Sequence, residues 1–130
     1  MLFRSLARGT VRGLHYQAAP HQEAKIVRCT AGAIYDVVAD LRRGSRSYGK
    51  WAGVELSAGS RRMLYVPAGC AHGFQTLEDN CEVFYQISTE HEPAGFRGVR
   101  YDAPALAIQW PLPVSVISER DRALPQPLPA

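Results

Sequence analysis

The sequence predicts an all-β sandwich or barrel, folded as one domain over residues 1–130. Runs rich in β-branched and aromatic residues recur at short intervals, and glycine or proline turns separate them. Helical character is confined to one short segment near the C-terminus. A chain of 130 residues is long enough to bury one hydrophobic core without cross-links.

Six strands are expected, at Ala24–Cys29, Ala33–Leu41, Trp51–Leu56, Arg62–Val66, His72–Thr76 and Glu82–Ser88. The second run is the longest, and it lies between Gly32 and a polar loop at 42–49. The fourth ends in a Pro-Ala-Gly turn signal. Residues 118–123 are expected to be helical, and the proline-rich end at 125–129 is expected to form an extended or frayed tail.

Composition excludes several functional classes. Apolar residues make up 46% of the chain, but no apolar run approaches the roughly 20 residues needed to span a bilayer, so no membrane partner is expected. The net charge of +3 is mild, and basic residues do not alternate with aromatics in a dense patch, which argues against nucleic-acid binding. The three cysteines lack metal-finger spacing and are expected to be free thiols in a reducing cytoplasm.

The sharpest local motif is P-x-G-x-x-H at residues 67–72. It describes a strand end, a tight turn and a histidine that begins the next strand. The turn is expected to place His72 on the inner wall of a small barrel, a pattern typical of cupin jelly rolls. Metal-binding cupins also need two closely spaced histidines and a carboxylate. This chain offers His15 and Gln17, with His21 and Glu23 farther along, and His-x-Gln is a poor substitute for His-x-His. No metal and no cofactor are therefore expected.

Further motifs follow one another in a fixed order: Arg12–Gln17 (RGLHYQ), Lys25–Arg28, Tyr35–Arg42, Tyr48–Trp51, Val54–Ala58, Pro67–Phe74 and Arg97–Arg100. From about Gly9 to about Arg122, this series closely resembles the dTDP-4-dehydrorhamnose 3,5-epimerase family. The resemblance implies a metal-free, cupin-like jelly-roll barrel with a short C-terminal helical segment. It also implies a homodimer that acts in the cytoplasm on a nucleotide sugar.

Enzymes of this family invert C3 and C5 of a 4-keto-6-deoxy sugar attached to a nucleoside diphosphate. Each inversion needs a base on one face of the ring, an acid on the other, and stabilisation of the enolate oxygen. By resemblance, His15 is the base and Asp121 is the carboxylate that pairs with it. Lys25 would stabilise the enolate beside the ketone, and Tyr85 would donate the proton on the opposite face.

The resemblance also implies residues that bind the rest of the substrate. Arg12 and His72 match positions near the diphosphate, where donors suit a doubly negative linker. Arg120 is expected to reach a phosphate, and Gln17 is expected to support the wall of the site.

The chain departs from the family pattern at the nucleotide end. Family members carry a longer segment before the RGLH motif, whereas eleven residues precede Arg12 here, so the sequence predicts a domain without that segment. Gln86 replaces a lysine, Glu90-His91 replaces a tyrosine pair, and Gln109 replaces an aspartate. The four residues expected at the sugar ring are intact, which predicts that epimerase chemistry is retained with a different or more loosely held carrier.

Other functions remain open at this stage. The chain could invert a single carbon. It could be a sugar 3,4-ketoisomerase, which also uses a small metal-free cupin barrel, although the RGLHYQ stretch argues against this. A non-catalytic remnant would bind a sugar nucleotide without exchanging protons. A metal-dependent cupin oxygenase would contain a metal. The presence of all four expected catalytic side chains favours the epimerase.

Overall fold

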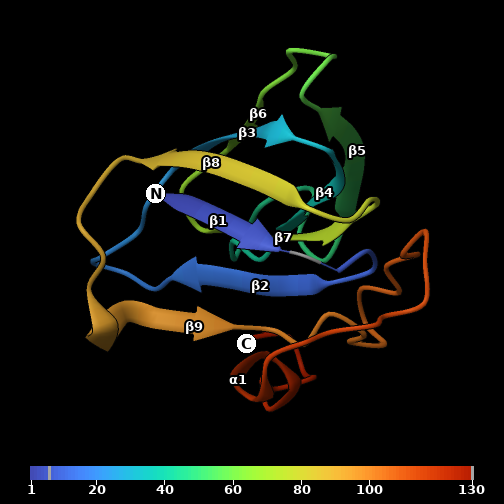
Figure 1. The fold of residues 1–130 in the computed structure, drawn as a ribbon. Helices are drawn as coiled ribbons and strands as arrows, with labels where there is room; N and C mark the ends of the chain where they lie inside the picture. The colour runs from blue at the N-terminus through green and yellow to red at the C-terminus, as the bar shows by residue number, and fades with distance from the viewer. Residues whose placement is uncertain (6, 130) are drawn as a thin grey trace.

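The structure is a computed structural model, and it describes residues 1–5 and 7–129. Over these residues the chain forms two antiparallel sheets packed face to face, with a short helix beside one edge (Figure 1). The predicted cupin-like jelly-roll barrel is confirmed. In this same part of the chain, no helix is long and apolar enough to cross a membrane.

The first sheet has the strand order β1-β8-β3-β6, and the second has the order β5-β4-β7-β2-β9. The elements of the first sheet are β1 (Leu2–Ser5), β8 (Cys81–Ile87), β3 (Lys25–Ala31) and β6 (Leu64–Val66). Those of the second are β5 (Trp51–Ser57), β4 (Ala33–Asp40), β7 (Cys70–Thr76), β2 (Val11–Gln17) and β9 (Phe96–Gly98). A 3-10 turn, η1 (Pro93–Gly95), precedes β9, and α1 spans Glu119–Arg122.

The six predicted strands correspond to β3 through β8, and the predicted helical segment contains α1. The sequence did not predict β1, β2 or β9. In β2, Gly13, His15 and Gln17 interrupt the apolar alternation that usually marks a strand. His15 and Gln17 are polar because they line a cavity, and Gly13 is small because β7 approaches it closely, so the pattern differs from that of an ordinary core strand.

The long apolar run of β4 results from burial on both of its faces. Ile34 packs into the cluster between the two sheets, whereas Val37 and Ala39 pack into a second cluster with Val99 and Leu106 from the C-terminal segment. That segment therefore covers the outer face of the five-stranded sheet. A strand covered on both sides has no polar face and shows little alternation.

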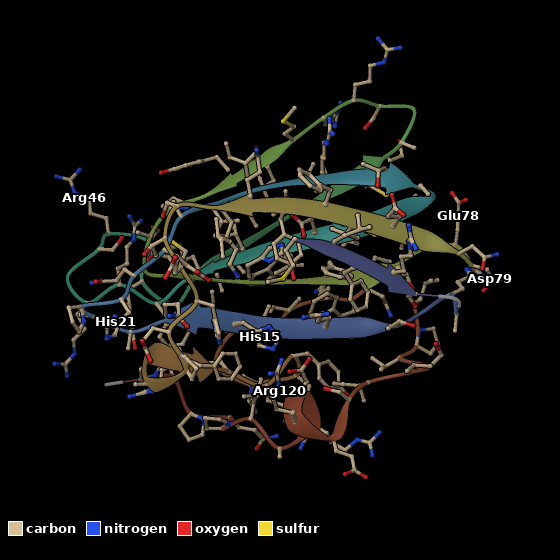
Figure 2. The ribbon with its side chains drawn as sticks, turned by 60° about the vertical axis from the view of Figure 1, so that its left-hand side comes forward. His15, His21, Arg46, Glu78, Asp79 and Arg120 are labelled. Carbon is tan, nitrogen blue, oxygen red and sulfur yellow. The ribbon has the colours of Figure 1, made fainter. Side chains whose placement is uncertain are left out.

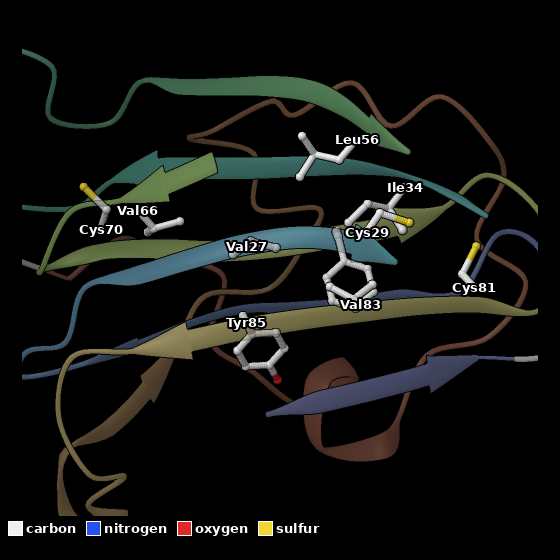
Figure 3. Close-up of a cluster of buried hydrophobic side chains, with 10 residues drawn as sticks. Val27, Cys29, Ile34, Leu56, Val66, Cys70, Cys81, Val83 and Tyr85 are labelled. Atoms are coloured by element: carbon white, nitrogen blue, oxygen red, sulfur yellow. The ribbon is translucent and has the colours of Figure 1, made fainter. Parts of the chain in front are cut away.

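The main core lies between the sheets, where Val27, Val83 and Leu56 are almost completely buried (Figure 3). Cys29, Cys70 and Cys81 belong to the same cluster and are free thiols, as predicted. Burial raises the pKa of the Cys29 thiol to about 11. This thiol therefore acts as a small apolar side chain at neutral pH.

Asp40 organises the predicted loop that follows β4. Its carboxylate accepts hydrogen bonds from the backbone N–H of Arg42, at 3.0 Å, and from the Arg42 guanidinium, at 2.9 and 3.0 Å. The hydroxyls of Ser45 and Ser47 donate to Asp40 Oδ2. The loop is thus fixed around one buried charge.

The C-terminal tail is extended, which is one of the two forms predicted for it, and it is anchored to the domain. The carbonyl oxygen of Pro125 accepts a hydrogen bond from the Arg100 N–H at 2.9 Å. The Tyr48 hydroxyl donates to the carbonyl of Pro129, and Leu128 packs on the outer apolar cluster. Proline lacks an N–H but keeps its carbonyl, so the tail is anchored through acceptors.

Candidate active site

A cavity of about 150 Å³ lies between the two sheets and reaches α1. It brings together six of the eight predicted site residues from their separate places in the chain. Its lining includes Arg12, His15, Gln17, Lys25, Tyr85 and Arg120. Asp121 lies directly behind His15, and Figure 2 shows His15 on β2 close to Arg120 on α1.

The strand β2 presents Arg12 and His15 to the same cavity, although residues three apart in a regular strand face opposite sides. The pairing of β2 with β7 shifts register between these two residues, which brings both side chains to one side. Gly13 lies within the shift at φ +119°. A Cβ at this position would lie 2.6 Å from the Gly73 Cα, so only glycine fits the close approach of the two strands.

His15 forms a pair with Asp121. Its Nε2–H donates to Asp121 Oδ1 at 2.6 Å, and the Gly13 N–H donates to Asp121 Oδ2 at 3.0 Å. Asp121 is only 2% exposed. The helix α1 holds it in place, because the Ser118 hydroxyl caps the helix by accepting from the Asp121 N–H at 3.1 Å.

The pair fixes the state of the imidazole. A carboxylate only accepts hydrogen bonds, so Nε2 carries the proton and the lone pair of Nδ1 is the basic site of the ring. Burial lowers the pKa of His15 from its ordinary value, although the Asp121 carboxylate opposes this effect. His15 is therefore neutral near pH 7 and is able to accept a proton. The hydrogen bond from His15 lowers the pKa of Asp121 despite its burial, which keeps the carboxylate charged.

Tyr85 faces the cavity from the opposite sheet. It lies on β8, where alternate residues point inward, and it is 8% exposed. Figure 3 shows its hydroxyl directed away from Val27 and the core. Burial raises the pKa of Tyr85, so the phenol keeps its proton at neutral pH. A neutral base and a protonated acid thus lie on opposite walls of one cavity.

Lys25 begins β3 and brings its ammonium into the cavity, with 8% of the residue exposed. Its Nζ lies 3.7 Å from Glu23 Oε1. Burial lowers the pKa of Lys25, whereas the carboxylates of Glu23 and Asp36 raise it. The sequence analysis considered Glu23 only as a metal ligand and did not predict this pairing.

His72 lies deeper than the other predicted residues. It is 5% exposed and its Nε2–H donates to Asp36 Oδ1 at 2.6 Å. With Arg12 and Lys25, it lines a small inner cavity that continues the site. The sequence analysis missed Asp36, although a carboxylate inside the apolar run of β4 is a signal of a buried partner.

Two arginines lie at the mouth of the site. The Arg12 guanidinium stacks over the Phe3 ring at 4.6 Å, and that of Arg120 stacks over Phe96 at 4.8 Å. Both also line a neighbouring apolar groove that Phe3 and Val116 help to form. Two cations beside an apolar groove suit a ligand that joins an anionic group to an apolar or aromatic one.

Gln17 is 2% exposed and is fixed by a hydrogen bond from its Nε2 to the Glu92 carbonyl at 3.1 Å.

Within the described residues, no three His, Cys, Asp or Glu side chains come together as they would around a metal ion. Of the four side chains considered as metal ligands, His15 is paired with Asp121 through Nε2, and His21 lies well away from it (Figure 2).

The chain was compared with protein families and with known proteins. The family model described as dTDP-4-dehydrorhamnose 3,5-epimerase matches residues 2–127. The dTDP-4-dehydrorhamnose 3,5-epimerase of Sinorhizobium fredii is 46% identical over 118 residues, which cover 90% of this chain and 60% of that protein. The dTDP-4-dehydrorhamnose 3-epimerase of Streptomyces niveus is 44% identical, over 88% of this chain and 56% of that protein.

A solved dTDP-4-dehydrorhamnose 3,5-epimerase from Bacillus anthracis, with TDP and pyrophosphate bound, is similar in structure. It superposes with a TM-score of 0.94 at 40% identity, over 96% of this chain and 71% of that one. The chain spans less than two thirds of the length of the two curated relatives described above.

Proposed function

Because the chain belongs to the dTDP-4-dehydrorhamnose 3,5-epimerase family, we propose that it is a nucleotide-sugar epimerase. The substrate class is a 4-keto-6-deoxyhexose carried on a nucleoside diphosphate, and the reaction inverts C3, C5 or both. One observation supports this most strongly. His15, backed by Asp121, and Tyr85 face each other from two different sheets across one cavity, with Lys25 beside them.

In the proposed reaction, the neutral His15 ring takes the proton from a carbon next to the ketone. The C–H bonding electrons move into the ring to form an enolate, and the negative charge collects on the former carbonyl oxygen. The Lys25 ammonium stabilises that oxygen, and Asp121 stabilises the imidazolium. Because Lys25 and Asp121 are buried, their charges act more strongly than they would in bulk solvent.

Inversion is completed from the other wall of the cavity. Tyr85 donates its proton to the opposite face of the same carbon, and the electrons return to re-form the ketone. The phenolate then recovers a proton and the imidazolium loses one, both through solvent. Deuterium from heavy water therefore enters the inverted carbon, which makes the reaction visible by NMR.

The nucleotide end of the substrate is proposed to lie at the mouth of the cavity. Arg12 and Arg120 supply positive charge for the diphosphate, and the adjoining apolar groove, with a volume of about 370 Å³, is proposed to accept part of the nucleoside. His72, whose Nε2–H is donated to Asp36, is proposed to contact the substrate from within the site. Gln17 is proposed to form part of the sugar wall.

The test is proton exchange measured by NMR. The purified protein is incubated with dTDP-4-keto-6-deoxyglucose in heavy water, and deuterium is followed at C3 and C5. Entry at both positions, abolished in His15→Ala but preserved in the exposed-site variant Glu55→Gln, supports the 3,5-epimerase. Binding of the nucleotide sugar without exchange at either position would overturn the proposal and favour a non-catalytic binding protein.

A single inversion is the second candidate, and the similarity to a 3-epimerase of Streptomyces niveus favours it. It uses the same base, acid and cation, and it predicts deuterium at C3 alone. The same experiment therefore separates the two reactions.

We further propose that the protein is a cytoplasmic homodimer, because the family resemblance implies both properties. Light scattering coupled to gel filtration should give about twice the chain mass of 14.3 kDa. A mass equal to one chain would refute the dimer.

A further inference from the structure

Glu23 is a buried carboxylate in the cavity that the proposed proton transfers do not use. It lies between β2 and β3, two residues before Lys25, and it is 8% exposed. Its Oε1 lies 3.7 Å from the Lys25 Nζ, and among the described residues its Oε2 is buried without a hydrogen-bond partner. A buried, partly unsatisfied carboxylate costs stability, so its presence here requires a reason.

The distance within this ion pair is informative. At 3.7 Å the two atoms attract strongly, but they are farther apart than in a hydrogen bond. The three N–H donors of the Lys25 ammonium are therefore not committed to Glu23. A pair at about 2.8 Å would fix one of these donors on the carboxylate and direct it away from a ligand.

Lys25 faces several other charged or titratable groups, and they differ in sign. These are Arg12 and His15 from β2, Asp36 from β4, His72 from β7, Tyr85 from β8 and Arg120 from α1. Asp36 is the other carboxylate that acts on Lys25; its Oδ1 accepts from His72, and its Oδ2 is buried without a partner among the described residues. Glu23 has the larger effect of the two on Lys25, and it is the one that forms an ion pair with the ammonium.

We propose that Glu23 is a positioning residue that keeps the Lys25 ammonium charged and leaves its donors directed at the enolate oxygen of the substrate. The part that concerns the enolate rests on the proposed function, whereas the electrostatic part does not. Burial alone favours the neutral amine, which would stabilise an enolate poorly. The carboxylate opposes this tendency without occupying the donors.

The sequence makes a direct test practical, because Lys25 and Lys50 are its only lysines. Lysine side chains labelled with ¹³C give two NMR signals that can be titrated with pH, and Lys50→Arg assigns them. In Glu23→Gln, which keeps the shape of the side chain, the midpoint for Lys25 should fall by about 1 pH unit or more. The exposed-site control Glu55→Gln removes the same charge elsewhere and should leave the midpoint unchanged. An unchanged midpoint in Glu23→Gln would overturn the inference.

The conservative variant Glu23→Asp extends the test if the amide variant fails to fold. It keeps the charge but withdraws it by one methylene, so the Lys25 midpoint should fall by a smaller amount than in Glu23→Gln. No fall at all in Glu23→Asp would count against a role that depends on distance.

Activity provides the second measurement. Lys25 acts as a cation, so the exchange rate is lost as pH rises through its pKa, and this loss should begin at lower pH in Glu23→Gln. The change should appear in kcat, with KM within about twofold of wild type. If KM rises in Glu23→Gln while the Lys25 NMR midpoint and the pH at which activity is lost both stay unchanged, Glu23 contacts the substrate directly. That result would overturn the inference. If the wild-type protein shows no exchange, the proposed function fails, but the shift of the Lys25 midpoint still tests the role of Glu23.

Discussion

Replacing Asp121 with asparagine tests the central pair of the site, because the amide cannot satisfy both of its neighbours. Asp121 accepts from the His15 Nε2–H at 2.6 Å and from the Gly13 N–H at 3.0 Å. In Asp121→Asn, one of these donors must face the amide NH₂, which is also a donor. If the NH₂ faces His15, the ring is driven to the opposite tautomer and its basic nitrogen points at the helix.

The size of the effect follows from these contacts. Hydrogen bonds to a charged group contribute about 1.5–3 kcal/mol each. The variant loses one of these two bonds, and the other becomes a bond to a neutral amide oxygen. The charge matters most once His15 has become an imidazolium, so the cost falls on the transition state. We expect proton exchange to slow by about 10²–10⁴-fold, which corresponds to about 3–5 kcal/mol.

The pH dependence gives an independent readout. His15 must be neutral to act as a base, so activity is lost as pH falls through its pKa. Asp121 raises that pKa against the effect of burial. Its replacement should therefore lower the His15 pKa further and move the acid limb of the rate profile to lower pH.

The assay combines deuterium exchange at C3 and C5 with an NMR titration of the His15 ring, which needs no substrate. Glu119→Gln is the matched control, because Glu119 is exposed on the same helical turn and makes no contact with His15. Its exchange rate should stay within about twofold of wild type. An asparagine variant with an undiminished rate and an unmoved acid limb would refute the role assigned to the pair.

Three further substitutions test other parts of the molecule. Tyr85→Phe keeps the buried ring but removes the proposed acid, so net inversion should fall by about 10²–10⁴-fold while exchange on the His15 face falls much less; equal loss of both would contradict the assignment of Tyr85. Gly13→Ala should lower the free energy of unfolding, measured with urea, by about 2–4 kcal/mol, because the new Cβ would meet the Gly73 backbone at 2.6 Å; a loss below about 0.5 kcal/mol would contradict the close approach. Asp40→Asn should lower the free energy of unfolding by about 2–3 kcal/mol, because its amide would face several donors. The His15 titration should not move. The Arg42 guanidinium holds the pKa of Asp40 well below its ordinary value of 3.8. The difference in free energy of unfolding between wild type and Asp40→Asn should therefore be complete above that pH and shrink as pH falls. A difference that is constant with pH would contradict the ion pair.

The sequence predicted the strands whose buried side chains are mostly apolar. The runs that became β3, β4 and β8 have this property, and their bounds agree with the structure to within two residues. Strand β2 was missed because its pattern follows the needs of the cavity, with His15 and Gln17 at inward positions where a core strand would carry valine or leucine. The tail was expected to be extended or frayed because its prolines cannot donate; the structure shows it extended, with proline carbonyls as hydrogen-bond acceptors.

The candidate site could be predicted only in part. Composition and spacing indicated no relation between His15 and Asp121, which are 106 residues apart, and the pairing was expected solely because of the family resemblance. Pairings of this kind depend on the sheet order and on how α1 docks, and local periodicity contains neither. The resemblance in turn did not indicate Glu23 or Asp36, which became recognisable only when burial and distances were known.

The late position of Asp121 has a consequence for the synthesis of the protein. At ribosomal rates of about 5–20 residues per second, the codon for Asp121 is read roughly 5–20 s after the codon for His15. Toward the end of that interval all the strands have been synthesised, but α1 and its carboxylate are still missing. The nascent chain therefore has a histidine, a lysine and a tyrosine without the group that orients the base, and the site is completed only when the last helical turn docks.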